Sequence, residues 1–166
     1  MSFRMRCLAT FAALAVVQAA SMQEYVWRLR PFVFGRLKVP TGFHAELHNY
    51  REGILTTLHY PDGAYIVLQH GGMYRIPMFE SAEHVLKSST ELQGKTVRVG
   101  RFANSELLWR EDNYKPGKAG EGRAGSPGAY PPNVGYAKVP ASRQAEFDGA
   151  LDSFEREIER TENGGR

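Results

Sequence analysis

The sequence feature that most limits the fold of this chain is a turn at Pro61-Asp62-Gly63. Proline presets φ at the first central position of a turn, and glycine accepts the left-handed conformation that closes it. We therefore predict a β-hairpin with a three-residue loop. The predicted register pairs Tyr60 with Ala64, Leu58 with Ile66, Thr56 with Leu68 and Ile54 with His70. The other face of this hairpin is expected to present Leu55, Thr57, His59, Tyr65, Val67 and Gln69.

A second turn is indicated by Gly71-Gly72. A two-residue loop would place Arg75 opposite Leu68 on the apolar face, whereas a loop of residues 71–73 keeps that face apolar. We therefore predict a third strand, in which Tyr74 pairs with His70, Ile76 with Leu68 and Met78 with Ile66. The resulting apolar patch, which needs a cover, consists of Ile54, Leu58, Ile66, Leu68, Ile76 and Met78.

The first 19 residues have the pattern of a secretory signal peptide. Arg4 and Arg6 precede an apolar run that begins at Cys7, and small residues end near Ala19. We expect cleavage near Ala19 and an extracytoplasmic mature protein, either periplasmic or secreted; the alternative is a buried N-terminal helix. Cleavage would remove the only cysteine, so the mature fold would have no disulfide bond.

Composition and charge indicate one ordinary globular domain without a nucleic-acid partner. The 166 residues are 42% hydrophobic and 23% charged, as is usual for such domains. Loss of Arg4 and Arg6 would leave 19 basic against 18 acidic residues. A nearly neutral chain gives no electrostatic reason to expect nucleic-acid binding.

Further strands are predicted around the hairpin. Residues 43–49 alternate strictly between two faces, residues 84–92 fit a strand or a short helix capped by Ser81, and residues 95–102, 106–111 and 134–139 fit strands. We divide the chain into a signal peptide (1–19), a basic-aromatic segment (20–42), an antiparallel sheet domain (43–114), a flexible Gly/Pro-rich loop (115–133), the final strand and helix of the same domain (134–162) and a disordered tail (163–166).

One C-terminal amphipathic helix is predicted over residues 143–160, with Ser142 as its N-cap. Asp152 and Arg156 are expected one turn apart on its solvent side. We expect its apolar stripe to cover the hairpin patch, which gives an α+β fold: an antiparallel β-meander of about six to eight strands, in the form of a curved or half-barrel sheet, with this helix on one face. The stripe consists of Phe147, Ala150, Leu151, Phe154 and Ile158.

The main candidate for a binding site is the sheet face away from this helix. His59 and Tyr65 would pair across the hairpin and line a groove, although cross-strand pairing for stability is the simpler explanation. Trp109 lies next to Arg110, Glu111 and Asp112, where an indole could stack on a sugar and carboxylates could exchange protons. Neighbouring strand residues point to opposite faces, however, so a structural role is favoured there. The candidate ligand-binding residues are Leu55, His59, Tyr65, Val67, Gln69 and Trp109.

A second candidate is the group His44, Glu46 and His48, which shares one face of a predicted strand. Two imidazoles and a carboxylate could hold zinc or another divalent metal and leave a position open for water. Same-face neighbours on a strand are about 7 Å apart, a long reach for ligands of one ion. We therefore favour a solvated polar face and predict no cofactor.

The basic-aromatic segment offers a third candidate. Its cations, Arg28, Arg30, Arg36 and Lys38, could dock on an anionic envelope surface, or simply keep an extended segment soluble. The leading prediction is a small exported, non-enzymatic module that binds an unidentified protein or small ligand. The alternatives are a metal-dependent hydrolase or metal-binding protein using the His/Glu/His strand, and an envelope-surface docking protein using the basic-aromatic segment.

Overall fold

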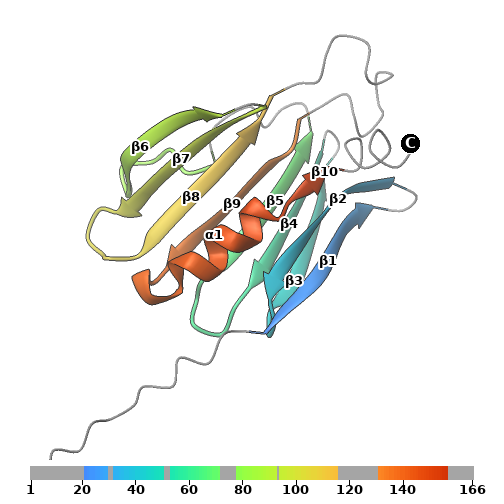
Figure 1. Ribbon diagram of the computed structural model, residues 1–166, viewed down its shortest axis with the longest axis horizontal. Coiled ribbons are helices and arrows are strands. Elements are labelled where there is room, and N and C mark those ends of the chain that lie inside the picture. The colour runs from blue at the N-terminus through green and yellow to red at the C-terminus, as the bar shows by residue number, and fades with distance from the viewer. Residues whose placement is uncertain are drawn as a thin grey trace, which may run out of the picture.

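The computed structural model describes residues 21–29, 32–50, 53–71, 78–92, 94–115 and 131–156. These residues form two antiparallel sheets, a 3₁₀ turn and one α-helix (Figure 1). The strands are β1 (Met22–Leu29), β2 (Phe32–Pro40), β3 (His44–Tyr50), β4 (Gly53–His59), β5 (Tyr65–Gly71), β6 (His84–Leu92), β7 (Lys95–Phe102), β8 (Leu108–Tyr114), β9 (Asn133–Val139) and β10 (Glu155–Arg156); the 3₁₀ turn is Ala141–Arg143 and helix α1 is Gln144–Asp152.

The large sheet has seven strands in the order β3-β4-β5-β9-β8-β7-β6, and the small sheet has the order β1-β2-β10. Figure 1 shows α1 and the small sheet in front of the large sheet. The prediction of an antiparallel sheet with a C-terminal helix is confirmed. The segment predicted only as extended and basic-aromatic supplies the first two strands of the small sheet. No helix in the described part of the chain is both long and apolar enough to span a bilayer.

The hairpin register predicted from Pro61-Asp62-Gly63 is confirmed. β4 pairs with β5 so that Leu58 faces Ile66 and Thr56 faces Leu68, and the Tyr60 amide donates to the Ala64 carbonyl over 2.9 Å. Gly63 has φ of +87°, the left-handed conformation that closes the loop. The loop chemistry therefore fixed which side chains of both strands enter the core.

The predicted third strand of this meander is wrong, because β9 occupies the edge of β5 assigned to it. Leu68 pairs with Val134 and Ile66 with Tyr136, instead of with Ile76 and Met78. A proline cannot donate to a central ladder, and Pro77 lies within the segment we had placed there. Residues 72–77 lie outside the described part of the chain, while Met78 is in a turn.

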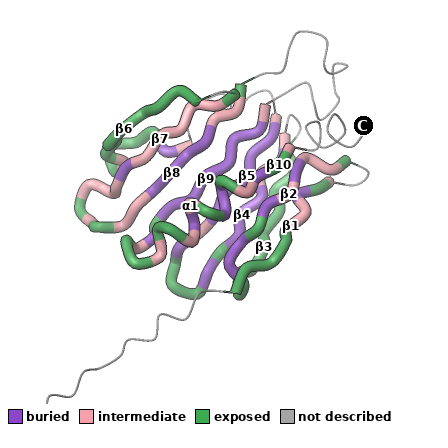
Figure 2. Tube along the Cα trace, in the orientation of Figure 1, coloured by how far each residue is buried: buried purple, intermediate pink, exposed green. Residues whose placement is uncertain are grey.

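The core lies between the large sheet and the layer formed by α1 and the small sheet. Buried residues run along the middle strands of the large sheet (Figure 2). In α1 the buried residues are Phe147, Ala150 and Leu151, which belong to the same core cluster. The Trp27 indole is fully buried and donates from Nε1 to Thr56 Oγ1 over 3.1 Å, which ties the two sheets together. Other members of this cluster are Leu37, Val39, Ile54, Leu58, Ile66, Leu68, Val134, Tyr136, Phe147, Ala150, Leu151 and Phe154.

The helix is shorter than predicted. A 3₁₀ turn precedes it, Arg143 occupies its N-cap position without a side-chain hydrogen bond, and Ser142 does not cap it. The chain leaves the helix after Asp152 because it pairs with β2 as β10: Phe154 packs so closely over Gly35 that a Cβ there would lie 2.5 Å from the ring. Arg156 therefore lies on a strand and not one turn after Asp152, and Ile158 lies outside the described residues.

The strands predicted after residue 80 are present, with small differences in their bounds. Residues 84–92 form a strand, and Ser81 accepts a hydrogen bond from the Glu83 amide instead of capping a helix. The predicted strand 95–102 matches β7, while β8 starts and ends later than the predicted 106–111. The predicted signal peptide (1–19), most of the Gly/Pro-rich loop and the C-terminal tail lie outside the described residues.

Candidate functional site

Two groups of residues that the sequence presented separately lie on one side of the large sheet. β3 pairs with β4 so that His44 faces His59, Glu46 faces Thr57 and His48 faces Leu55. β4 in turn pairs His59 with Tyr65 and Leu55 with Gln69. Cross-strand partners share a face, so the His/Glu/His group and the hairpin candidates form one surface opposite the core, which we call the outer face.

Glu46 lies at the centre of the exposed part of this face. Its Oε1 lies 3.0 Å from His48 Nε2, and its Oε2 lies 3.3 Å from His59 Nε2. The His48 ring stacks with Tyr50 and the His59 ring packs beside Tyr65, each pair with ring centroids 6.2 Å apart. A row of aromatic and imidazole rings thus extends on both sides of one carboxylate, and the side chains of Glu46, His48 and His59 are each about half exposed.

The geometry on this face differs from that of a metal centre. Among the residues that the structure describes, no three His, Cys, Asp or Glu side chains gather closely enough to hold a metal ion. The two imidazoles that approach Glu46 come from different strands, β3 and β4, while His44 is paired across from His59. The contacts therefore join neighbouring strands through the carboxylate.

The other hairpin candidates are less accessible. Leu55 and Tyr65 are half-buried, but Val67 and Gln69 are each only 8% exposed. Gln69 Oε1 is buried and has no hydrogen-bond partner among the described residues. A ligand on the outer face would therefore contact the residues around Glu46 more readily than Val67 and Gln69 of β5.

Trp109 also points to the outer face but is part of a second hydrophobic cluster. It is 1% exposed, packs against Phe79, and donates from Nε1 to the Arg101 carbonyl over 3.2 Å. Gly100 lies under the indole, where a Cβ would come within 2.4 Å of the ring. The ring that could have stacked on a sugar is covered by the chain itself.

Glu111, beside Trp109 on the outer face, holds the segment that covers this cluster. Its carboxylate is fully buried, accepts a hydrogen bond from the Met78 amide over 2.6 Å, and lies 3.3 Å from the Arg98 guanidinium. Burial raises the pKa of Glu111, which the amide donors and Arg98 partly oppose. This carboxylate therefore anchors the chain at Met78 to the sheet.

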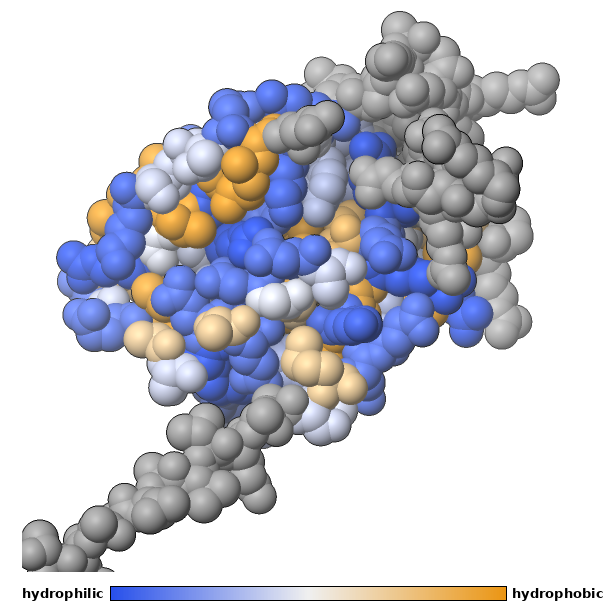
Figure 3. Space-filling view, viewed as in Figure 1, coloured by the Kyte–Doolittle hydropathy of each residue, from blue (hydrophilic) through white to orange (hydrophobic). Residues whose placement is uncertain are grey.

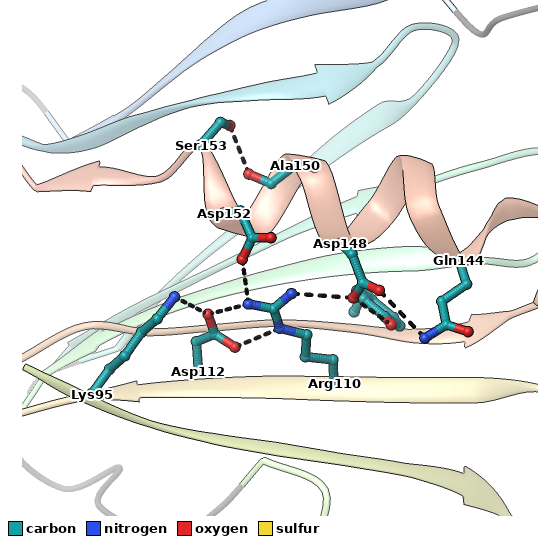
Figure 4. A network of polar contacts seen from close by, with 9 residues as sticks. Lys95, Arg110, Asp112, Gln144, Asp148, Ala150, Asp152 and Ser153 are labelled. Carbon is teal, nitrogen blue, oxygen red and sulfur yellow. Dashed lines mark hydrogen bonds and ion pairs between the residues drawn. The ribbon is translucent and has the colours of Figure 1, made fainter. Parts of the chain in front are cut away.

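Arg110, one residue earlier, points to the core side and joins the sheet to α1 (Figure 4). Its guanidinium forms a two-bond contact with Asp112 at 2.8 and 2.9 Å and also donates to Asp148 at 3.1 Å and Asp152 at 2.6 Å. Lys95 lies 2.6 Å from Asp112. The prediction that Glu111 and Asp112 point to opposite faces is thus confirmed.

This Arg110 network is satisfied internally. Tyr136 donates its hydroxyl hydrogen to Asp148 over 3.0 Å, and Gln144 contacts the other oxygen of the same carboxylate. Burial alone would lower the pKa of Arg110, but the hydrogen bonds to the surrounding carboxylates outweigh it and raise this pKa above its usual value. Sequence reasoning missed the helix partners; their signal was the spacing of Asp148 and Asp152 by four residues, which places both on one side of a helix.

The basic-aromatic residues lie on the small sheet. Arg36 lies 3.5 Å from Glu24, and both line an open groove of about 510 Å³ together with Lys38 and Glu155. The groove therefore mixes two cations with two carboxylates. Arg28 is exposed, and Arg30 lies outside the described residues. Figure 3 shows that hydrophilic side chains cover most of the described surface on the side of α1.

Among these polar groups, the row around Glu46 places an exposed carboxylate beside exposed imidazole rings. Arg110 and Glu111, in contrast, are buried and form their polar contacts within the fold. The outer face around Glu46 is therefore the candidate functional site. Comparison of the chain with protein-family models, curated proteins and solved structures found no match.

Proposed function

We propose that the protein is a small exported, non-enzymatic binding module whose ligand contacts the outer face around Glu46. The observation that supports this is a row of side chains on a face that neither α1 nor the small sheet covers. Tyr50, His48, Glu46 and His59 in this row are exposed, and Tyr65 beside His59 is half-buried. The other face of β4 and β5 packs into the core.

The chemistry of this row suits a ligand with hydroxyl or amide groups beside an apolar surface. The Glu46 carboxylate accepts hydrogen bonds, the imidazoles of His48 and His59 donate or accept them, and tyrosine rings offer flat contact area with a polar end. An extended peptide or an oligosaccharide has both features. The sheet beneath keeps the row rigid, which lowers the entropy cost of binding.

Binding is tested by titrating ¹⁵N-labelled protein with a panel of extended peptides and a panel of soluble oligosaccharides. We expect one panel to shift amide signals of β3, β4 and the start of β5, and His59→Ala or Glu46→Ala to weaken that binding about tenfold or more. Glu155→Ala, in the groove of the small sheet, is the control and should bind normally. Shifts confined to the groove, with loss of binding in the control variant, would contradict the proposal.

Export and sheet shape belong to the same proposal. The sequence pattern of residues 1–19 supports export, and N-terminal sequencing of the accumulated protein should give a chain that begins at Ala20. We also infer a curved, half-barrel form of the large sheet, supported by the packing of both α1 and the small sheet against its one side. Docking on an anionic envelope surface has less support, because Glu24 and Glu155 line the same groove as Arg36 and Lys38.

A further inference from the structure

Among the described residues, β3 is an edge strand of the large sheet whose protection against pairing is limited to one carboxylate, Glu46. It is exposed at all seven positions, including Leu47 at 49% and Tyr50 at 45%. Natural edge strands are commonly protected by lysine, proline or a β-bulge, which stop another chain from pairing there. The sequence of β3, HAELHNY, contains no lysine, arginine or proline. Its pairing with β4 also runs without a bulge from His44 to Tyr50.

The opposite edge of the same sheet shows the contrast. β6 is also exposed, and Leu86 is 48% exposed. Its register with β7, however, shifts between Leu86 and Ser88, and Lys87 is the residue at that bulge. A bulge with a lysine is a protected edge. Among the described residues, the bulge and Lys87 therefore block strand addition at β6, while β3 is left open to it.

We propose that β3 pairs antiparallel with β3 of a second copy of this chain, about a two-fold axis that passes beside Leu47. In this register Glu46 faces the partner's His48, so the two symmetric contacts each join a carboxylate to an imidazole. Leu47 meets its own symmetry mate, and His44 faces the partner's Tyr50. Hydrogen-bonding groups therefore meet each other, and apolar side chains meet each other, at the central positions.

The side-chain directions agree with this register. A two-fold axis normal to the sheet keeps each face of the sheet on the same side in both copies. Glu46 and His48 both lie on the outer face, because they pair with Thr57 and Leu55, whereas Leu47 pairs with the buried Thr56. A shift by one residue would place polar outer-face residues opposite core-side residues. The strand is thus self-complementary in one register.

The pairing goes beyond the proposed ligand site and does not depend on it. It would join the outer faces of two copies into one surface, with the two rows around Glu46 side by side. A ligand with repeating units could then bind both rows at once and gain avidity.

The test is sedimentation velocity of the purified protein at about 100 µM, a concentration that detects weak dimers. We expect a dimer for the unchanged protein. Leu47→Lys places two like charges together at the axis and should raise the dimer dissociation constant at least about tenfold. Leu86→Lys, the matched change at an equally exposed leucine of β6, should leave the dimer unchanged.

A charge exchange tests the register itself. Glu46→Lys should weaken the dimer, and the double variant Glu46→Lys with His48→Glu should restore it, because the exchanged pair attracts again. Both side chains are about half exposed, so circular dichroism should show an unchanged fold. A monomeric unchanged protein, a Leu47→Lys dimer, or open polymers that Leu86→Lys abolishes would each overturn the proposal. So would a monomer that binds extended peptides along β3.

Discussion

His70 should make this fold less stable in mild acid. It lies on the core side of β5, 8% exposed, with its ring centroid 4.5 Å from that of Phe34 and 6.2 Å from that of Trp27. Burial, reinforced by the charge of Arg156, lowers the pKa of His70 to about 4. The native ring is therefore neutral at a pH where the same ring in the unfolded chain is protonated.

The size of the effect follows from this difference. A histidine in the unfolded chain titrates near pH 6.5, so between pH 6.5 and about 4 the unfolded state binds more protons and the free energy of unfolding falls as the pH falls. From these two pKa values, linkage gives a decrease in the free energy of unfolding of about 2 kcal/mol between pH 7 and pH 5. Above pH 6.5 the contribution of His70 is fully present. A loss of this size is a large share of the stability of a typical domain.

The assay is urea unfolding at pH 7 and at pH 5, followed by tryptophan fluorescence. His70→Gln keeps a neutral polar side chain and removes the titration, so the variant should lose about 2 kcal/mol less than the unchanged protein over this pH range. His59→Gln, at an exposed imidazole, is the matched control. Glu111 titrates in all three proteins, so its contribution cancels in the comparison. If His70→Gln retains the full pH dependence, the reasoning is refuted.

Three further substitutions test the contacts that shape the fold, each by urea unfolding against the unchanged protein. Arg110→Met leaves the fully buried Asp112 with Lys95 alone and should lower the free energy of unfolding by about 3 kcal/mol; a loss below about 1 kcal/mol would show that Lys95 suffices. Tyr136→Phe removes one hydrogen bond to Asp148 and should cost about 1 kcal/mol, with no loss if water replaces the bond. Gly35→Ala should cost about 1–3 kcal/mol, because its Cβ would collide with the Phe154 ring; an unchanged value would mean that the ring moves freely.

Local chemistry explains which parts of the fold the sequence could predict. The turn at Pro61-Asp62-Gly63 specified the pairing of β4 with β5, because loop length and turn residues determine register over short distances. The pairing of β5 with β9 joins residues that are far apart in the sequence, such as Leu68 and Val134. No local pattern in the sequence encodes such a contact. The turn signal of Gly71-Gly72 instead favoured the next segment along the chain as the partner of β5, and β9 takes that place.

The same distinction applies to the site and to the helix end. The alternation in β3 and in the hairpin predicted two polar faces, and only the pairing of His44 with His59 showed that they are one. The end of α1 depends on the fit of Phe154 over Gly35, a contact between residues far apart in the sequence. The apolar stripe alone predicted a longer helix, because Phe154 continues the helical spacing while lying beyond the helix.

The central position of β9 has a consequence for the order in which this protein can fold. β3, β4 and β5 form one consecutive unit, β6, β7 and β8 form another, and β9 is the strand that joins them. The two units cannot share a hydrogen-bond ladder until residues 133–139, which follow both units in the sequence, have joined the sheet. High sequence separation slows folding, so the large sheet should close in a late, slow step, and a chain that stops before residue 133 should hold two unjoined meanders.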